Sequence, residues 1–201
     1  MRLGIFGGSF DPVHCGHLLL AESCREVCRL DCVWFLPAAA APHKRERRTA
    51  SARQRVEMLR LAIGGHPGLD VSTLEIDRGG VSYTVDTLES LHNAQPDTEL
   101  FLLMGADTLV DLPNWRAPAR ICELAVPVAV GRAGSPAPDY SLLSHLVSAD
   151  RLDYFRQYYV HMPIVELTST DIRERVAAGQ SIRYRTPRAV EKYIETNGLY
   201  R

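Results

Sequence analysis

The chain alternates between short continuous runs of apolar residues and longer stretches in which apolar residues recur every three or four positions. A short apolar run is typical of a strand buried on both faces, and the wider spacing is typical of a helix with one buried face. Alternation of this kind favours right-handed βαβ crossovers and a mostly parallel sheet covered on both faces. We therefore predict a Rossmann-like, doubly wound α/β fold. The predicted strands cover residues 3–6, 32–36, 69–74, 100–104 and 126–130.

Residues that flank the helical patterns locate the helix ends. Ser51 and Gln54 have the spacing of a capping box before the apolar positions of one helix, and Gly64 follows as its end. Another helix is predicted over about 84–93.

The last part of the chain is predicted to be helical. Ser169 is placed to cap a helix that continues to about residue 178, and Gly179 ends it. Pro187 suits the first turn of a final helix that stops at 197–198. We expect one domain over 1–201, with a small helical C-terminal part from about 165 to 201.

The composition is that of an ordinary globular protein. Hydrophobic residues make up 46% of the 201 residues, and the formal net charge is −1. Binding of nucleic acid or of an anionic membrane usually accompanies a basic excess, so we expect neither partner, and any anion site must be local. No run approaches the roughly 18 to 20 apolar residues of a membrane span, and we expect a cytoplasmic protein.

The cysteines raise the question of a metal site. Cys24, Cys28 and Cys32 recur every four residues, a spacing that on a helix would place them on one face. Thiolate zinc sites need a second pair of ligands, and no such set stands out, so we interpret these cysteines as small buried residues and predict no metal site. Cys15 is either an accessible thiol or, as we favour, a variable filler position.

A glycine-rich segment, residues 7–17, separates the first predicted strand from a strongly apolar helix. The two glycines at its start allow a sharp turn and a close approach to a ligand. The first amides of the following helix lack helical partners and carry the positive end of the dipole, which favours anions. His14 and His17 add ring N–H donors, and Gly16 leaves space between them. The segment therefore predicts a phosphate site.

The order Gly-Gly-Ser-Phe-Asp-Pro followed by His-x-Gly-His resembles the HxGH nucleotidyltransferase superfamily. The preceding Phe-Asp-Pro and the strand-to-helix context make the match specific; the alternative is a tight turn without a ligand. For Asp11 and Pro12 we favour a structural role in shaping the turn. The residues of this turn that we assign to ATP are Gly7, Gly8, Ser9, Phe10, His14, Gly16 and His17.

Within the superfamily, nearly the whole chain is most similar to the bacterial nicotinate mononucleotide adenylyltransferases. Four further stations carry this resemblance: Pro42-His43-Lys44, residues 82–88 from Ser82 to Leu88, Gly105-Ala106-Asp107 with Trp115, and residues 169–173 from Ser169 to Arg173. The implied reaction is attack of the mononucleotide's phosphate oxygen on the α-phosphorus of ATP, giving nicotinate adenine dinucleotide and pyrophosphate in NAD biosynthesis. Mg²⁺ bound through the ATP phosphates is the implied cofactor.

The resemblance implies roles for the phosphate-binding residues. His14 and His17 act on the ATP phosphates, with His17 the stronger candidate at the α-phosphate. Ser169, Thr170 and Arg173 hold the β and γ phosphates from a second helix N-terminus. The alternatives without phosphate binding are that Ser169 only caps a helix and that Arg173 is an exposed helix residue without a function.

Other residues are assigned to the two nucleosides. Trp115 is implied to stack on the pyridine ring, or is ordinary core, and the amides of Tyr83 and Thr84 receive the nicotinate carboxylate. Lys44 binds the mononucleotide's phosphate, or belongs to a solvated charged loop. Asp107, beside Gly105 in the ATP site, contacts ribose hydroxyls or a metal-bound water, or caps a helix.

The sequence departs from the family's pattern at two places, and several other functions are compatible with it. The family commonly has two serines before the threonine of the last motif, whereas Thr168 precedes Ser169 here, and residues 37–41 are rich in alanine. The enzymatic alternatives are a phosphopantetheine adenylyltransferase and a cytidylyltransferase for a small alcohol phosphate. The non-enzymatic alternative is a nucleotide-binding regulator that has lost catalysis. A homo-oligomer is compatible with all of these.

Overall fold

A computed structural model describes residues 1–39, 49–132, 137–163 and 165–201. Its centre is a six-stranded sheet in the order β3-β2-β1-β4-β5-β6, in which every pairing is parallel. This confirms the predicted fold class. The strands are β1 (Arg2–Gly8), β2 (Cys32–Pro37), β3 (Leu69–Val71), β4 (Glu99–Gly105), β5 (Ala125–Arg132) and β6 (Tyr159–Met162).

Strand order reverses beside β1, because the chain adds β2 and β3 on one side of it and β4, β5 and β6 on the other. In such a sheet the loops diverge at the carboxyl ends of the two central strands, and ligands bind in the resulting crevice. β1 ends at Gly8 and β4 ends at Gly105. The first predicted motif and the Gly-Ala-Asp station therefore meet at this crevice.

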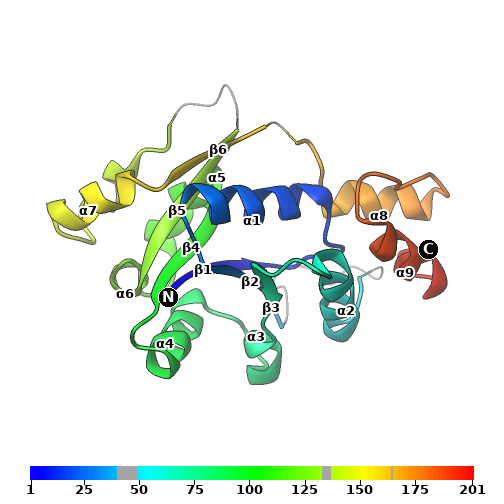
Figure 1. The fold of residues 1–201 in the computed structure, drawn as a ribbon, viewed down its shortest axis with the longest axis horizontal. Helices are drawn as coiled ribbons and strands as arrows, with labels where there is room; N and C mark the ends of the chain where they lie inside the picture. The colour runs from blue at the N-terminus through cyan, green and yellow to red at the C-terminus, as the bar shows by residue number, and fades with distance from the viewer. Residues whose placement is uncertain (40–48, 133–136, 164) are drawn as a thin grey trace.

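Helices cover both faces of the sheet, with α1 along one face and α3 and α4 along the other (Figure 1). At the end of the molecule far from the N-terminus, α8 lies near α9 (Figure 1), and α9 packs against α2. The helices are α1 (Cys15–Val27), α2 (Ala52–Ile63), α3 (Leu74–Arg78), α4 (Thr84–Ala94), α5 (Ala106–Asp111), α6 (Pro118–Leu124), α7 (Ala149–Arg156), α8 (Ser169–Ala177) and α9 (Arg188–Thr196), with 3-10 turns at Leu112–Asn114 and Tyr140–Leu143.

The predicted helix ends hold at α2, whereas at α8 and α9 the start lies one residue from its predicted place: Pro187 is the N-cap of α9 and not a residue of its first turn. Ser51 and Gln54 form the capping box of α2, and Gly64 is its C-cap. The cap of α8 is Thr168, whose hydroxyl accepts a hydrogen bond from the Asp171 amide at 3.0 Å. Ser169 is instead the first helical residue, so the prediction that it caps α8 is wrong.

Two strand predictions also change. The strand predicted over 69–74 ends at Val71, because Thr73 bonds the Asp77 side chain at 2.7 Å and α3 starts at Leu74. The edge strand β6 was not predicted, since its residues Tyr-Val-His-Met include a polar position and form no continuous apolar run.

The cysteines are small buried residues in part, as predicted. Cys24 and Cys28 are buried and Cys32 is half-buried. They share no helix face, because α1 ends at Val27 and Cys32 starts β2. Over the described ranges, no three His, Cys, Asp or Glu side chains are grouped to hold a metal.

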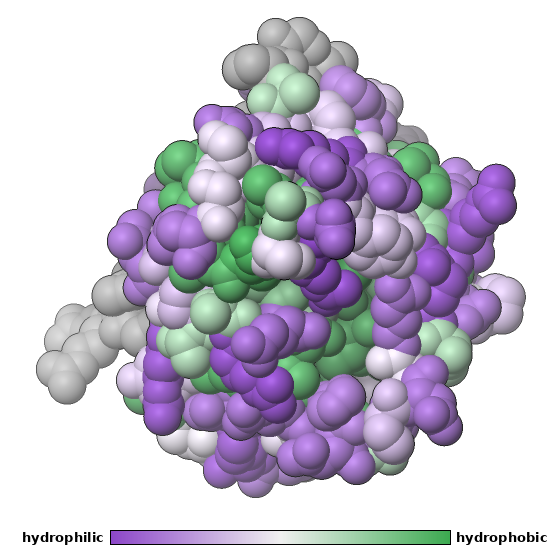
Figure 2. Space-filling view, turned by 90° about the vertical axis from the view of Figure 1, so that its left-hand side faces the viewer, coloured by the Kyte–Doolittle hydropathy of each residue, from purple (hydrophilic) through white to green (hydrophobic). Residues whose placement is uncertain are grey.

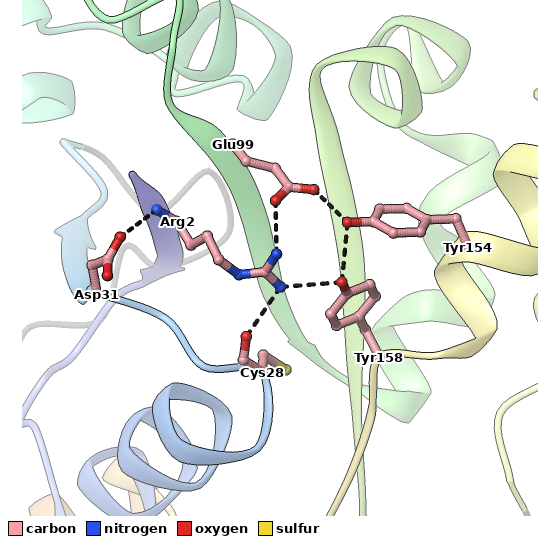
Figure 3. A network of polar contacts seen from close by, with 6 residues as sticks. All are labelled: Arg2, Cys28, Asp31, Glu99, Tyr154 and Tyr158. Carbon is pink, nitrogen blue, oxygen red and sulfur yellow. Dashed lines mark hydrogen bonds and ion pairs between the residues drawn. The ribbon is translucent and has the colours of Figure 1, made fainter.

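Polar side chains close into a ring at the amino end of the sheet (Figure 3). Arg2 donates from Nη1 to Glu99 Oε2 at 2.9 Å and from Nη2 to the Tyr158 hydroxyl at 3.1 Å. The Tyr158 hydroxyl donates to Tyr154 at 3.0 Å, and Tyr154 donates to Glu99 Oε1 at 2.6 Å. Arg2 Nη2 also bonds the Cys28 carbonyl at 3.1 Å. The ring joins β1 and β4 to α7.

Figure 2 shows the outer surface on the side of α7, where hydrophilic residues cover most of the face and hydrophobic ones are visible between them. Among the helices of the described residues, none has the length and apolar character needed to cross a membrane.

Candidate active site

The backbone of the turn after β1 folds around one buried ring. Phe10 has a φ of +48° and is 1% exposed, and it packs at about 5 Å centroid distance on Phe6 (5.3 Å) and Phe35 (5.4 Å). A Cβ on Gly8 would lie 2.8 Å from the Phe10 ring, which explains this glycine. The Phe10 side chain is therefore core, and any contact of this residue with ATP is through its backbone. A Cβ on Gly7 would meet nothing within 4 Å, so space is open beside that residue.

His14 and His17 lie face to face at the start of α1. Their ring centroids are 3.6 Å apart with an interplanar angle of 18°. The His14 amide donates to His17 Nδ1 at 3.3 Å, and the His17 amide donates to the His14 carbonyl at 2.9 Å. Since Nδ1 of a neutral His17 accepts, its proton is on Nε2. His17 thus presents an N–H donor on the side away from the backbone.

Both imidazoles are neutral at pH 7. Burial lowers the pKa of His14 to about 4, and burial together with the charge of His14 lowers the pKa of His17 to about 3. Within the described structure, Nδ1 of His14 is buried with no hydrogen-bond partner. A buried polar atom without a partner is costly, so a ligand that supplies one is favoured here.

Gly16 makes room for this histidine. A Cβ at Gly16 would lie 3.1 Å from His14 Nδ1 and 3.5 Å from the Val165 side chain. The glycine therefore avoids a side chain that would crowd the His14 ring, and its role in leaving space for a phosphate stays a prediction.

A cavity of about 560 Å³ opens between the start of α1 and the carboxyl ends of β4, β5 and β6. Polar groups on its wall include the two imidazoles and the Gly105 and Asp107 segment. Apolar side chains form much of the remaining wall, which suits a planar base: Leu20, Val110, Val130, Met162, Val165 and Leu167.

Asp107 is exposed on the wall of this cavity. It lies in the first turn of α5, whose N-cap is Gly105, so the alternative that Asp107 caps this helix is wrong. Asp139 also lines the cavity, and sequence reasoning missed it, because it lies in a loop without a recognisable motif.

The start of α8 contacts the turn after β1. Arg173 is 6% exposed and donates from Nη1 to the Asp11 carbonyl at 2.8 Å and from Nη2 to the Thr170 hydroxyl at 3.3 Å. The Ser169 hydroxyl donates to the Pro12 carbonyl at 2.9 Å. The structure thus brings these residues to the turn as predicted, and Arg173 is not the exposed helix residue of the alternative. Their contacts support the turn's backbone, and phosphate binding by them stays a prediction.

Asp11 is a structural residue of the turn, as predicted. It is 5% exposed, and its carboxylate accepts from the Ala50 amide at 3.0 Å and from the Tyr200 hydroxyl at 2.7 Å. Burial and the nearby Asp11 carboxylate raise the pKa of Tyr200, which keeps its proton for this bond. The Thr186 hydroxyl donates to the Val13 carbonyl at 2.9 Å. The C-terminal segment therefore holds the turn from several directions.

Arg55 is a second support that sequence reasoning missed. It is 7% exposed and donates to the Ser9 carbonyl at 2.7 Å and to the Ala38 carbonyl at 2.6 Å. Burial lowers its pKa, and Asp11 opposes this effect. The signal was its spacing, since Arg55 is four residues before Leu59 and shares the buried side of α2. Arg55 joins the loops that follow β1 and β2.

A second group of predicted residues gathers at the start of α4. Tyr83 is the N-cap of α4, and Thr84 is its first residue. The Ala39 amide donates to the Ser82 hydroxyl at 3.4 Å, which brings the loop after β2 to this helix. Trp115 is half-buried at the end of a 3-10 turn, and packs against the core. Lys44 lies outside the described residues, with the rest of 40–48.

Comparison with known proteins identifies the family. Residues 5–175 match the family model described as cytidylyltransferase-like. The chain is 43% identical to a protein of Rhodopirellula baltica, with 99% of this chain and 93% of that protein covered. It is 45% identical to a protein of Thermus thermophilus, with all of both chains covered. Both relatives carry the name "Probable nicotinate-nucleotide adenylyltransferase".

Solved structures share the fold. A Plasmodium falciparum nicotinic acid mononucleotide adenylyltransferase complexed with NaAD superposes with a TM-score of 0.74 at 16% identity, covering 99% of this chain and 97% of the other. The same enzyme complexed with APC gives 0.73 at 15% identity, covering 99% and 96%. Together with the full-length matches in sequence, the imidazole pair at the switch point of a parallel sheet shows that this chain belongs to the cytidylyltransferase-like family and, within it, to the nicotinate-nucleotide adenylyltransferases.

Proposed function

We infer that this chain transfers the adenylyl group of ATP to nicotinate mononucleotide and so forms nicotinate adenine dinucleotide and pyrophosphate, a step of NAD biosynthesis. The relatives' shared name and their identity over the whole chain support this activity. The observation that carries it is the stacked pair of His14 and His17 at the N-terminus of α1, on the wall of the cavity.

The reaction needs alignment and charge stabilisation more than it needs a reactive side chain. An oxygen of the mononucleotide's phosphate forms a bond to the α-phosphorus of ATP, and the bond from that phosphorus to the bridging oxygen of pyrophosphate breaks. Both reactants are anionic, so fixed donors lower the barrier. His17 offers Nε2–H and the first amides of α1 offer further donors, at the positive end of the dipole.

ATP binds along the cavity in this proposal. The base and ribose lie against the apolar wall, with Asp107 near the ribose hydroxyls, and the triphosphate passes Gly7 and Gly16 to reach the imidazoles. Ser169, Thr170 and Arg173 then contact the β and γ phosphates, in addition to their observed bonds to the turn. The backbone of Ser9 and Phe10 contributes from the turn.

The mononucleotide binds at the start of α4. Trp115 stacks on the pyridine ring, and the Tyr83 and Thr84 amides receive the carboxylate, because helix N-terminal amides favour an anion. Lys44, outside the described residues, binds the mononucleotide's phosphate.

Mg²⁺ fits this site as an ion carried by the substrate. The described residues offer no group of three metal-binding side chains, whereas Mg²⁺ is commonly held by substrate phosphates with only one or two carboxylates. Asp107 and Asp139 are the carboxylates on the cavity wall. Bound there, the ion supplies positive charge to the triphosphate.

A substrate panel tests the proposal. ATP or CTP is combined with nicotinate mononucleotide, nicotinamide mononucleotide or phosphopantetheine, and released pyrophosphate is measured. We expect ATP with nicotinate mononucleotide to be the fastest pair. Release with phosphopantetheine alone would assign the chain to another adenylyltransferase, and release only with CTP to a cytidylyltransferase. ATP binding without pyrophosphate release from any pair would indicate a regulator.

A further inference from the structure

Arg116 places a positive charge at the mouth of the proposed nicotinate site. Its guanidinium carbon lies 4.6 Å from the centroid of the Tyr83 ring, and its Nη1 lies 3.5 Å from Asp86 Oδ2. Tyr83 is the N-cap of α4 and is 41% exposed, while the Arg116 side chain is 58% exposed. The cation is therefore held against the side chains of the N-cap residue and of the first turn of the helix, and it is open to solvent.

This position is electrostatically unusual. A cation beside a helix N-terminus faces the positive end of the dipole and is disfavoured there. Asp86, in the first turn of α4, offsets part of this effect, and the Tyr83 ring holds the guanidinium by a cation–π contact. Two groups thus keep Arg116 at a place where its charge and the helix dipole act in the same direction on an incoming anion.

A neighbouring arginine shows the ordinary arrangement. Arg120 on α6 bonds two carboxylates, Glu89 at 3.1 Å and Glu123 at 3.0 Å. The charge of Arg120 is therefore neutralised by carboxylates on the protein surface. Arg116 is held instead by one carboxylate at a longer distance and by an uncharged ring, so more of its charge is available to a ligand.

We propose that the Arg116 side chain helps to select the acid form of the pyridine nucleotide over the amide, by placing its guanidinium beside the carboxylate that the α4 amides receive. The proposal rests on the proposed function, because it needs the pyridine ring on Trp115, the residue before Arg116 in the chain. Asp86 competes with the substrate carboxylate for the same cation. The ligand recognised is an aromatic carboxylate, and the neutral carboxamide gains nothing from the charge.

The test compares kcat/KM for nicotinate mononucleotide and for nicotinamide mononucleotide in the wild type, in Arg116→Gln and in the matched control Arg120→Gln. We expect Arg116→Gln to lower kcat/KM for the acid by about tenfold, the scale of one exposed charge-assisted hydrogen bond, and to leave the amide within about twofold. Arg120→Gln should leave both values at the wild-type level. Arg116→Lys keeps the charge but loses the planar stacking, and should lie in between.

A second variant, with an expected effect opposite to that of Arg116→Gln, makes the test more specific. Asp86→Asn removes the competing carboxylate, so the preference for the acid should increase in this variant and should return toward the wild-type value in high salt. An unchanged acid-to-amide ratio in Arg116→Gln, or an equal loss with both substrates, would overturn the proposal. Absence of pyrophosphate release from either mononucleotide in the wild type would instead overturn the proposed function.

Discussion

The two ends of the sheet use polar side chains in opposite ways. At the amino end, Arg2, Glu99, Tyr154 and Tyr158 bond one another in a closed ring (Figure 3). At the carboxyl end, His14 is buried with Nδ1 unpartnered in the described structure, and its pKa is lowered to about 4. The first arrangement pairs the Arg2 Nη atoms, both Glu99 oxygens and both tyrosine hydroxyls within the protein, and leaves only Arg2 Nε of these buried groups without a partner among the described residues. The second leaves a buried imidazole nitrogen without a partner among the described residues, where the proposed function places a ligand.

The side chains that bond the backbone of the turn explain how the protein keeps an unpartnered imidazole at the carboxyl end of the sheet. Arg55, Ser169 and Arg173 each bond backbone carbonyls of the turn. Because the backbone is held by residues that do not need the ligand, the imidazoles keep their geometry while their own bonding capacity stays free. Pre-organised donors of this kind need no rearrangement during the reaction.

Removing the donor at the open end should have the largest effect. We expect His17→Ala to lower kcat by about 10²-fold or more, since one transition-state donor is worth roughly 3 kcal/mol. Steady-state kinetics measure this, and circular dichroism checks that the fold is kept. His66→Ala is the matched control, because His66 pairs with Glu22 away from the turn and should keep its turnover. Near-normal turnover in folded His17→Ala would remove His17 from the catalytic residues.

The buried imidazole should also make stability depend on pH. The folded pKa of His14 is about 4 and its ordinary value is 6.5, so below pH 6.5 the unfolded chain binds a proton that the folded chain does not. This contribution is complete above about pH 6.5 and is lost as the pH falls toward 4. It amounts to at most about 3.5 kcal/mol, at roughly 1.4 kcal/mol for each of the 2.5 pKa units.

Urea unfolding of the wild type and of His14→Asn at pH 7 and at pH 4.5 measures this contribution. The free energy of unfolding should fall more steeply between pH 7 and pH 4.5 in the wild type than in the variant. Comparing the two proteins removes the pH dependence that comes from the carboxylates, because both proteins contain them. Equal slopes would show that His14 titrates normally in the folded protein.

The aromatic residue of the second substrate site should have a more selective effect. Trp115→Ala should weaken binding of the mononucleotide by about tenfold, as expected for one lost stacking contact of 1 to 1.5 kcal/mol. ATP affinity, measured by calorimetry, should be largely kept. An equal loss for both nucleotides would indicate that Trp115 supports the core instead.

The smallest effect is expected at the closed end. Tyr158→Phe removes the hydroxyl that joins Arg2 to Tyr154, and should lower the free energy of unfolding by about 1 kcal/mol. The values of kcat and KM should not change, because the ring lies at the opposite end of the sheet from the turn. A change in KM at unchanged stability would contradict the interpretation that the amino end of the sheet serves stability and the carboxyl end serves substrate binding.

Much of the fold was predictable because its central strands are buried on both faces. Residues of β1, β2, β4 and β5 form short, mostly apolar runs, which are typical of a sheet covered on both faces. The edge strands were harder, because each has one partner and is short. β3 covers Leu69–Val71 and β6 covers Tyr159–Met162, and neither carries a pattern that differs clearly from its flanks.

The geometry of the turn was predictable where local sequence determines it. The glycines, the histidines and the start of α1 act within one turn, so their order alone indicates a phosphate site. The supports depend on contacts between distant segments: Arg173 reaches Asp11 across 162 positions, and Arg55 reaches Ser9 across 46. A helical arginine carries no local signal of such a partner beyond its place on the buried side of the helix.

The bond from Tyr200 to Asp11 joins residues 189 positions apart. A ribosome makes Asp11 well before Tyr200, so the turn after β1 lacks this brace in a nascent chain until residue 200 has been added. Proteolysis before Tyr200 would therefore loosen a turn that lies 189 positions earlier in the sequence.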